Sequence, residues 1–360
     1  MSDVDYRIFD CGCIGAAHVR RDLPMQDHHE SLSTDNYNIA VISDGHGNRR
    51  HFRSDRGSKI ACDVAISVIS SFLDNNNTFD DMDDLLTSLK QEISDEWKKA
   101  VREDYKQFPW TEEELAEQLI LLSDDDYLRL VDGTTLEIPY GCTLCAVFNS
   151  SFGWAAVQVG DGSFALVDSD CTYRWPMPVS IYNQGNKTYS LCADDPMLDF
   201  RHVYGNDDFV AAMVYSDGIE KVFHDDSKEI MSFIYWLCNS RMKKEDSFDK
   251  NLETALHNIT TKSPIGDDIS IAGIINIHAE NIVPNLSQSQ KQNEIDAVYS
   301  KLDEVNSTIS YNMQRLYSIK FGNEFVATAD TIEQIQKVID RNKEESIRLL
   351  TMISEMKKGD

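Results

Sequence analysis

Acidic residues stand at the ends of several runs with strand-like composition. Asp44 follows "NIAVIS", Asp217 follows "VAAMVYS" and Asp161 follows "AAVQVG", whereas Asp267 and Asp268 directly precede "ISIAGII". Hard divalent cations prefer oxygen ligands, and a group of carboxylates without a cation would repel itself. If the fold brings these strand ends together, the residues predict a divalent-metal site.

Turn formation is the alternative explanation for these acidic residues, because Asp-Gly pairs are common turn signals. Asp161 lies in "VGDGSF" between two short strand-like runs, so a plain hairpin turn is favoured over metal binding there. Asp44 and Asp217 are each followed by a loop and then a helical pattern. A hairpin turn does not explain these two residues, and we interpret them as metal-site candidates.

A cation pair bridged by one carboxylate would support phosphoryl chemistry. Such a pair can lower the pKa of a water, aim it at phosphorus and neutralise charge on the phosphoryl group. Gly45 follows Asp44, and without a side chain its carbonyl can approach a second ion. His46 comes next and is either a turn histidine bonded to the backbone or a proton donor, since an imidazole titrates near neutrality.

The elements that would position these residues alternate between strand-like and helical patterns. Runs rich in β-branched and aromatic residues predict strands at 6–19, 38–43, 143–148, 154–159, 164–168, 209–216 and 269–277. Apolar residues at helical spacing predict two amphipathic helices within 58–125 and a second pair within 222–260. Strands in hairpins with helices inserted as pairs predict an α+β fold of antiparallel sheets covered by helices.

The composition changes after Ile277. Residues 281–293 are rich in Asn, Ser and Gln, and we interpret them as a linker between a domain at 1–280 and a module at 294–360. Apolar residues near a 3-4 repeat predict two helices in this module, joined near "FGNEFVATAD". The helices either pack on the first domain or form a coiled-coil-like hairpin for self-association or a protein partner, and the second alternative is favoured.

Charge and composition exclude some functional classes. With 34 basic and 61 acidic residues, the formal net charge is -27, which argues against binding to nucleic acid or to anionic membranes. The eight cysteines contain one CxxC pair, Cys142 and Cys145, which lacks a second pair to complete a zinc site, so reduced thiols are expected. Neither a signal peptide nor a membrane-spanning run is found, and we therefore expect a cytoplasmic protein.

Five motifs together resemble the protein phosphatase 2C family of metal-dependent Ser/Thr phosphatases. They occur in the family's order and approximate spacing: "AVISDGHGN", "YGCTLCAVF", "VQVGDGSFALVD", "MVYSDGIEKVF" and "GDDISIAGII". The upstream "AAHVRRDLPMQDHH" resembles the bacterial branch of that family. The resemblance implies two stacked antiparallel β-sheets flanked by antiparallel helix pairs, an α-β-β-α sandwich, with the C-terminal α-helical hairpin outside it.

The resemblance also implies a metal-site composition. Asp44 would bridge two Mg²⁺ or Mn²⁺ ions, and Gly45 would offer its carbonyl to one of them. Asp217 and Asp267 would complete the shell of the other ion. Asp27 would lie near the metals and contact them through water. The implied reaction is hydrolysis of a phosphoprotein by a metal-activated water.

Three further residues take their expected roles from the resemblance. Asp161 resembles the Asp that helps to hold a third ion in some members. His46 matches the histidine that is proposed to protonate the leaving serine or threonine oxygen. Asp268 replaces the Asn that usually follows the last metal-binding Asp, which adds negative charge near the site.

Two upstream positions depart from the family pattern. Gln26 stands where many members have a metal-binding Glu; it can coordinate through its oxygen but carries no charge, and so should weaken the second ion. Asp22 stands where the arginine that binds the substrate phosphate is usual. Arg20, Arg21 and His18 are the candidates to take over phosphate binding, and a displacement on a strand would change the face to which they point.

Two functional hypotheses follow from these motifs. The first is an active metal-dependent phosphoprotein phosphatase, favoured because Asp44, Asp217, Asp267 and His46 are all present. The second is a weakly active or inactive phosphatase-like module that regulates through partner binding by its C-terminal helices. Gln26 and Asp22 are the residues that favour this alternative.

Overall fold

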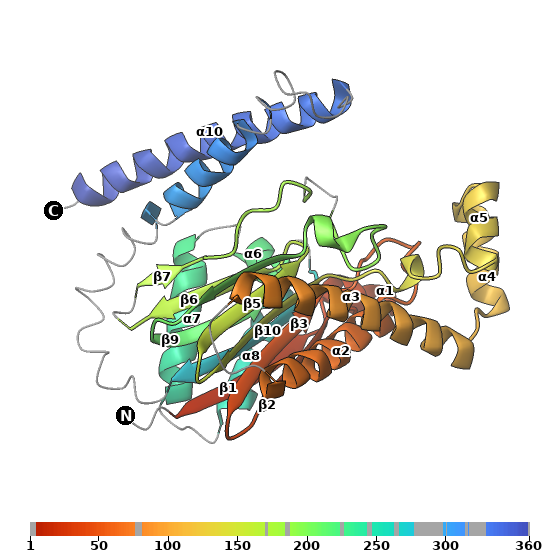
Figure 1. Cartoon of the computed structure of the whole chain (residues 1–360), viewed down its shortest axis with the longest axis horizontal. Coiled ribbons are helices and arrows are strands. Elements are labelled where there is room, and N and C mark those ends of the chain that lie inside the picture. The colour runs from red at the N-terminus through yellow and green to blue at the C-terminus, as the bar shows by residue number, and fades with distance from the viewer. Residues whose placement is uncertain are drawn as a thin grey trace.

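Two stacked antiparallel β-sheets form the centre of the computed structural model (Figure 1). The structure describes residues 5–75, 81–169, 172–183, 188–223, 227–242, 247–262, 266–276, 298–299, 301–313, 316 and 329–358. The first sheet has the order β1-β10-β9-β6-β7, formed by Tyr6–Cys13, Ile269–Asn276, Phe209–Tyr215, Ser163–Asp168 and Tyr173–Arg174. The second sheet has the order β2-β3-β4-β5-β8, formed by His28–Ser33, Tyr37–Ser43, Leu144–Ser150, Gly153–Val159 and Arg201–Gly205.

Helix pairs cover the outer faces of both sheets. Helices α2 (Ser54–Asn75) and α3 (Met82–Gln107) pack on the second sheet, and α7 (Ser227–Met242) and α8 (Phe248–Lys262) pack on the first. The α-β-β-α sandwich is therefore confirmed. The shorter helices of the sandwich are α1 (Ala16–Arg21), α4 (Glu112–Leu121), α5 (Asp124–Val131), α6 (Asp217–Val222), η1 (Ile138–Tyr140) and η2 (Pro196–Leu198).

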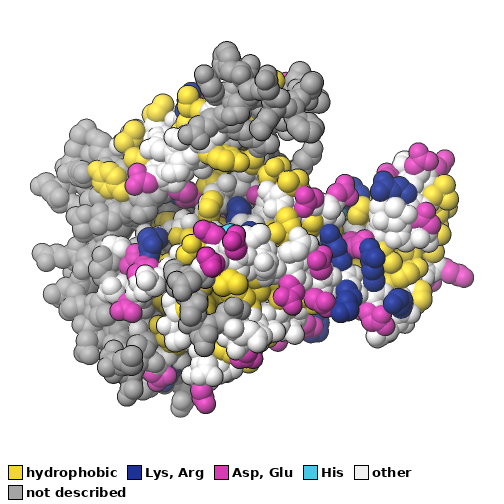
Figure 2. All heavy atoms as spheres, viewed as in Figure 1, with side chains coloured by type: hydrophobic (Ala, Val, Ile, Leu, Met, Phe, Trp, Pro, Cys, Tyr) yellow, Lys and Arg dark blue, Asp and Glu magenta, His cyan; other side chains and the backbone are white. Residues whose placement is uncertain are grey.

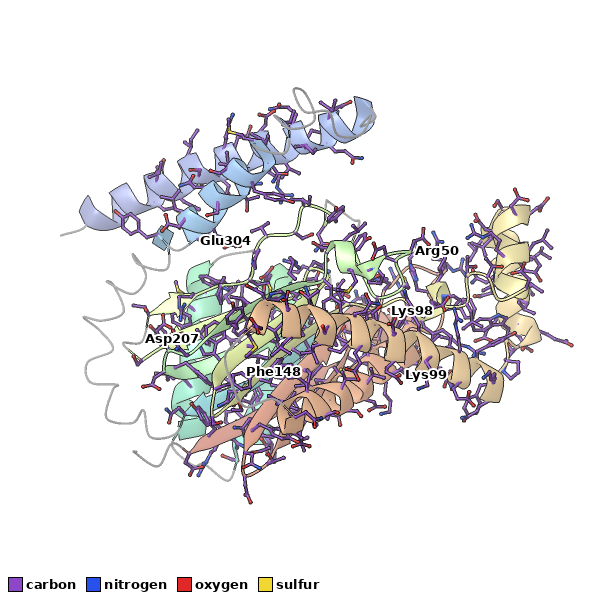
Figure 3. The ribbon with its side chains drawn as sticks, in the orientation of Figure 1. Arg50, Lys98, Lys99, Phe148, Asp207 and Glu304 are labelled. Atoms are coloured by element: carbon purple, nitrogen blue, oxygen red, sulfur yellow. The ribbon has the colours of Figure 1, made fainter. Side chains whose placement is uncertain are left out.

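Burial on both faces explains the apolar runs of the central strands. In β3, Ile39 and Val41 point to the helices, whereas Ala40 and Ile42 point to the other sheet. Phe148 of β4 packs against Phe72 of α2 with ring centroids 6.1 Å apart (Figure 3). A strand with two covered faces needs apolar residues at successive positions, and not an alternating pattern.

The structure differs from the predicted elements at the sheet edges and at residues 14–19. Strands β2 and β8 were not predicted, because edge strands with polar sequences such as "HHESLS" lack an apolar run. The strand predicted over 6–19 is wrong beyond Cys13. From Ala16 the chain forms α1, and Gly15 is the residue before its first turn.

Helices α4 and α5 project from the sandwich (Figure 1). The sequence indicated helical character to about residue 125 without separating these two helices. Figure 2 shows hydrophobic side chains on this projection, where Leu119, Ile120 and Leu128 are 57%, 85% and 62% exposed.

The C-terminal helices form the predicted antiparallel hairpin. Helical residues 301–313 lie beside α10 (Ala329–Lys358), with Leu302 and Val305 packed on Leu349 and, at the other end, Leu316 on Ile335. The predicted linker at 281–293 lies outside the described residues. Independent folding of the module at 294–360 stays a prediction.

The hairpin also contacts the sandwich. The Lys301 ammonium lies 6.0 Å from the ring centroid of Trp175 in a cation-π contact. Glu304 projects from the hairpin toward the sandwich (Figure 3), and its charge interacts with that of Arg201. Among the helices of the described ranges, none has both the length and the apolar composition that crossing a membrane requires.

Candidate metal centre

The pairing of β9 with β10 brings two of the predicted metal ligands together. The Ser216 N–H, just after β9, donates to the Ser270 carbonyl at 2.9 Å, and the Ser270 N–H donates to Ser216 Oγ at 3.0 Å. Asp217 follows as the first residue of α6, and Asp267 precedes β10. Because the end of one strand adjoins the start of its antiparallel neighbour, the two acidic residues lie at the same end of the sheet.

The second sheet supplies Asp44. Its N–H donates to Thr143 Oγ1 at 3.0 Å, and its carbonyl accepts from the Thr143 N–H at 2.8 Å. The next N–H, of Gly45, donates to the Gln26 carbonyl at 3.2 Å. A Cβ at Gly45 would lie 2.5 Å from that carbonyl oxygen, so the glycine is needed for this close backbone approach.

The carboxyl group of Asp44 lies among several other acidic groups. Burial raises its pKa well above the usual range, and neighbouring negative charges raise it further. These charges belong to Asp27, Asp217, Asp267 and Asp161. The fold therefore brings together all five carboxylates that were predicted to form the metal site, which we call the carboxylate cluster.

Two other members of the carboxylate cluster also hold protons unusually tightly. Burial and the charge of Asp268 raise the pKa of Asp27 to about 8, although Ser270 Oγ donates to its Oδ2 at 2.8 Å. Burial and the charge of Asp161 raise the pKa of Asp217 to about 7. Carboxylates with such high pKa values lack sufficient compensating positive charge.

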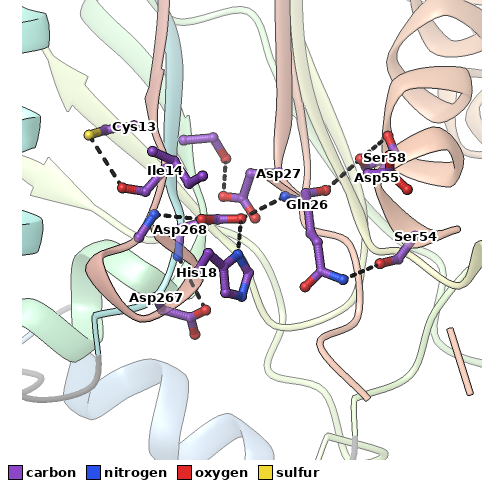
Figure 4. Close-up of polar contacts among 12 residues, drawn as sticks. Cys13, Ile14, His18, Gln26, Asp27, Ser54, Asp55, Ser58, Asp267 and Asp268 are labelled. Carbon is purple, nitrogen blue, oxygen red and sulfur yellow. Dashed lines mark hydrogen bonds and ion pairs between the residues drawn. The ribbon is translucent and has the colours of Figure 1, made fainter. Parts of the chain in front are cut away.

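The Asp268 carboxylate binds the start of α1 and the chain before β2, beside the carboxylate cluster (Figure 4). Its carboxylate accepts from the backbone N–H groups of Gly15 and Gln26, both at 2.6 Å. It also forms an ion pair of 2.9 Å with His18 Nδ1, and this contact raises the pKa of His18. The negative charge of Asp268 is thus used to position α1 and the chain before β2.

Asp161 lies where the chain crosses between the two sheets. The hairpin-turn interpretation is wrong, because β5 belongs to the second sheet and β6 to the first. Thr188 Oγ1 donates to Asp161 Oδ2 at 2.6 Å. The preceding Gly160 carbonyl accepts from Asn183 and Arg201, at 2.7 Å and 2.6 Å.

Gln26 presents a buried side-chain oxygen. Its Nε2 donates to Ser54 Oγ at 2.8 Å, and its backbone carbonyl accepts from Ser58 Oγ at 2.6 Å (Figure 4). Oε1 has no hydrogen-bond partner within the described part of the chain. The amide oxygen is therefore free for a ligand, while the amide nitrogen is held by α2.

His46 lies against a second histidine that the sequence did not single out. The ring centroids of His46 and His51 are 4.8 Å apart, and the His46 N–H donates to the Gly141 carbonyl at 3.0 Å. Burial lowers the pKa of His46 to about 4, and burial followed by the charge of His46 lowers that of His51 to about 4. His46 is therefore neutral at pH 7, contrary to the expectation that it titrates near neutrality.

The basic candidates for phosphate binding lie on a helix, not on a strand. Arg20 and Arg21 are exposed in the last turn of α1, whereas His18 is buried and paired with Asp268. Asp22 ends this helix in the left-handed conformation with φ of 56°. A short polar side chain tolerates this conformation well, which gives Asp22 a local structural role.

The donor set fits hard divalent cations. All candidate ligands offer oxygen, and Asp217 Oδ1 is buried with no hydrogen-bond partner among the described residues, as is Gln26 Oε1. Orphaned oxygens and carboxylates with raised pKa values are what a site for Mg²⁺ or Mn²⁺ would present without its ions. Asp44, Asp217 and Asp267 are the residues that would hold them.

We expect the metal-free protein to lose thermal stability as the pH rises from 6.5 to 9. The folded pKa values of Asp27 and Asp217, about 8 and about 7, lie above their unfolded values near 3.8, so the proton-linked stability is lost as pH rises through them. His46 and His51 titrate below this window. Melting in EDTA should show a decrease of roughly 3–6 °C.

Saturating Mn²⁺ should remove this decrease in melting temperature, because the cation replaces the protons. In EDTA, Asp44→Asn should make the decrease smaller. The surface variant Asp95→Asn, at an exposed position of α3, serves as the control and should keep the wild-type slope. A melting temperature in EDTA that is constant across the window would contradict the assignment of shared protons to the carboxylate cluster.

Several solved structures of phosphatases are similar to this chain. The catalytic domain of the serine/threonine phosphatase PstP, in complex with two manganese ions, has 12% identity and a TM-score of 0.45, and the match covers 75% of this chain and 97% of that one. Stp1 from Staphylococcus aureus has 12% identity and a TM-score of 0.46, with 76% and 95% covered. RsbX in complex with magnesium has 13% identity and a TM-score of 0.42, with 77% and 100% covered.

Sequence comparison gives the family. No curated protein matches the chain. A family model described as protein phosphatase 2C matches residues 14–257, which is more than half of the chain. The chain therefore belongs to the protein phosphatase 2C family of metal-dependent protein phosphatases.

Proposed function

We propose that this chain hydrolyses phosphoserine and phosphothreonine in proteins and depends on Mg²⁺ or Mn²⁺. The observation that carries the proposal is the convergence of Asp27, Asp44, Asp161, Asp217 and Asp267 at one end of the sandwich. The raised pKa values of Asp27, Asp44 and Asp217, and the unpaired buried oxygens of Asp217 and Gln26, indicate a site that requires cations. Family membership supplies the reaction class.

In this proposal each acidic residue has a separate task in holding cations. Asp44 would be a ligand shared by two ions, and the Gly45 carbonyl would be a ligand of one of them. Asp217 and Asp267 would hold the other ion, and Asp27 would act on the ions through water. When bound, the ions supply Lewis acidity, which lowers the pKa of water and neutralises charge on the phosphoryl group.

Two residues tune the number and strength of bound ions. The free Oε1 of Gln26 is a neutral ligand, so the ion it contacts is bound more weakly than by a carboxylate. Asp161 is the ligand for a third ion. Thr188 donates a hydrogen bond to its Oδ2 and so orients the carboxylate.

His46 acts on the leaving oxygen. As a neutral imidazole it donates one N–H to the serine or threonine oxygen and stabilises the negative charge that develops there. His51 packs beside the ring and restricts its orientation.

The substrate phosphate is bound by basic residues of α1. Arg20 and Arg21 are the candidates with exposed side chains, and an arginine matches phosphate geometry through paired N–H donors. His18 is the weaker candidate because its Nδ1 pairs with Asp268.

Two substrates of different leaving-group ability test the function. We expect Mn²⁺-dependent release of phosphate from p-nitrophenyl phosphate and from a phosphoserine peptide, both lost in EDTA. Asp44→Asn should lower turnover of both by at least ~100-fold, because the bridging ligand is lost. His46→Asn should lower peptide turnover by ~100-fold but spare p-nitrophenyl phosphate, whose leaving group needs no proton.

Asp63→Asn is the matched control for Asp44→Asn, since Asp63 lies on the surface in a pair with Lys59. It should retain full activity. Wild-type protein that binds Mn²⁺ but turns over neither substrate would overturn the enzyme assignment. Equal losses on both substrates in His46→Asn would exclude its role at the leaving oxygen.

We further propose that residues 294–360 form a separate module for self-association through the hairpin. Several apolar side chains of the hairpin are at least half exposed although its two helices already pack together. These residues are Tyr311, Met313, Ile347 and Leu350, at 56%, 52%, 66% and 52% exposure. Ile347 and Leu350 are three residues apart on α10 and so share one face of the helix, which supports an interface between chains there.

Charged substitutions on this surface test self-association. Ile347→Lys with Leu350→Lys should convert a dimer into a monomer in light scattering, because Lys cannot be buried at an apolar interface without loss of hydration. The control is Ile120→Lys on α4, whose side chain is 85% exposed. An unchanged mass in the double variant, or a monomeric wild type, would exclude self-association through the hairpin.

A further inference from the structure

One basic side chain lies inside the proposed metal centre. Lys221 Nζ is 2.8 Å from Asp217 Oδ2 and 2.7 Å from Asp267 Oδ2. Asp217 and Lys221 are one turn apart on α6, whereas Asp267 comes from the segment before β10. The ammonium therefore joins two of the three carboxylates that are proposed to hold the cations.

The surroundings of Lys221 differ from those of a surface ion pair. Its side chain is 34% exposed and that of Asp217 only 17%. In the surface pair of Lys59 and Asp63, the exposed fractions are 58% and 50%. Solvent screens the surface pair strongly, but it screens the contacts of Lys221 much less.

The charge of Lys221 is firmly maintained. Burial lowers the pKa of the ammonium, but the charges of Asp217 and Asp267 outweigh this effect, and the pKa is raised overall. The same ammonium lowers the pKa of Asp217 against the opposing effects of burial and Asp161. Lys221 thus supplies positive charge where a divalent ion would supply it.

We propose that Lys221 is a tethered cation of the metal centre, which occupies oxygens of Asp217 and Asp267 and competes with one divalent ion for them. This inference rests on the proposed function. When the ammonium is present, an ion must share or displace its contacts, so the site that uses Asp217 and Asp267 binds Mn²⁺ weakly. The orphaned Asp217 Oδ1 remains available to that ion.

Removal of the charge should therefore strengthen metal binding. An opposite charge at this distance shifts the proton affinity of a carboxylate by about tenfold or more, and its affinity for a cation responds in the same direction. We expect Lys221→Met to bind Mn²⁺ at its weakest site at least ~10-fold more tightly than the wild-type chain. Lys221→Arg keeps the charge and should stay near the wild-type affinity.

The test is isothermal titration of the full-length chain with MnCl₂, with Lys337→Met as the matched control for losing a lysine from an i,i+4 ion pair, here with Glu333. Tighter or additional Mn²⁺ binding in Lys221→Met supports the inference, and so does binding that appears in Lys221→Met but not in the wild-type chain. Unchanged or weaker binding in Lys221→Met overturns it and leaves the proposed function intact. Absence of binding in both chains overturns the inference together with the proposed function.

Thermal melting provides a second readout, the gain in melting temperature when Mn²⁺ is added. Lys221→Gln and Lys221→Met should gain more in melting temperature on addition of Mn²⁺ than the wild-type chain gains, since the ion replaces the lost ammonium. An equal gain in all chains would show that Lys221 has only a structural role. If Lys221→Arg binds Mn²⁺ as tightly as Lys221→Met, the charge at residue 221 is not what weakens Mn²⁺ binding.

Discussion

Mutual repulsion among carboxylates at one end of the sandwich is the constraint on which the site depends. Burial and the charges of its neighbours raise the pKa of Asp44 well above the usual range, and those of Asp27 and Asp217 reach about 8 and about 7. A fold that holds such groups together must balance their charge with protons or cations. Positive charge comes from Lys221 within the cluster, and the pairing of His18 with Asp268 beside it raises the pKa of the imidazole. The remaining deficit is what bound divalent ions would supply.

The two sheets hold the carboxylates together despite their repulsion. The hydrogen bonds between strands join backbone groups and do not depend on the acidic side chains. Asp217 and Asp267 lie at neighbouring ends of β9 and β10, and Asp44 follows a central strand of the other sheet. Asp268 connects the two sheets, since its carboxylate binds the N–H groups of Gly15 and Gln26. The apolar side chains buried between the two sheets stabilise the fold, and this offsets the repulsion among the carboxylates at one end of the sandwich.

The sequence predicted those parts of the fold that burial dictates. Runs such as 38–43 and 209–216 are apolar because both of their faces are covered, and the paired helices follow from apolar residues at helical spacing. The edge strands β2 and β8 could not be found in this way, since their residues are only partly buried and carry polar side chains. Whether 14–19 is strand or helix depends on contacts with Gly266 and Asp268, which are distant in the sequence.

The acidic members of the site could be predicted because their chemistry is visible at strand ends, but their partners could not. The interpretation of Asp161 was wrong because the sequence does not show that β5 and β6 belong to different sheets. One feature of the sequence points to Lys221: it stands four residues after Asp217, which places both residues on one face of a helix. His46 is neutral because of its burial, a property that only the packed structure reveals.

The most direct measurement for the central claim is anomalous X-ray diffraction at the manganese edge from crystals grown with Mn²⁺. The account predicts a manganese peak in contact with the Asp44 carboxylate and the Gly45 carbonyl, and a second peak bridged by Asp44 toward Asp217 and Asp267. Manganese bound only elsewhere on the chain, with the Asp44 carboxylate uncoordinated, would contradict it.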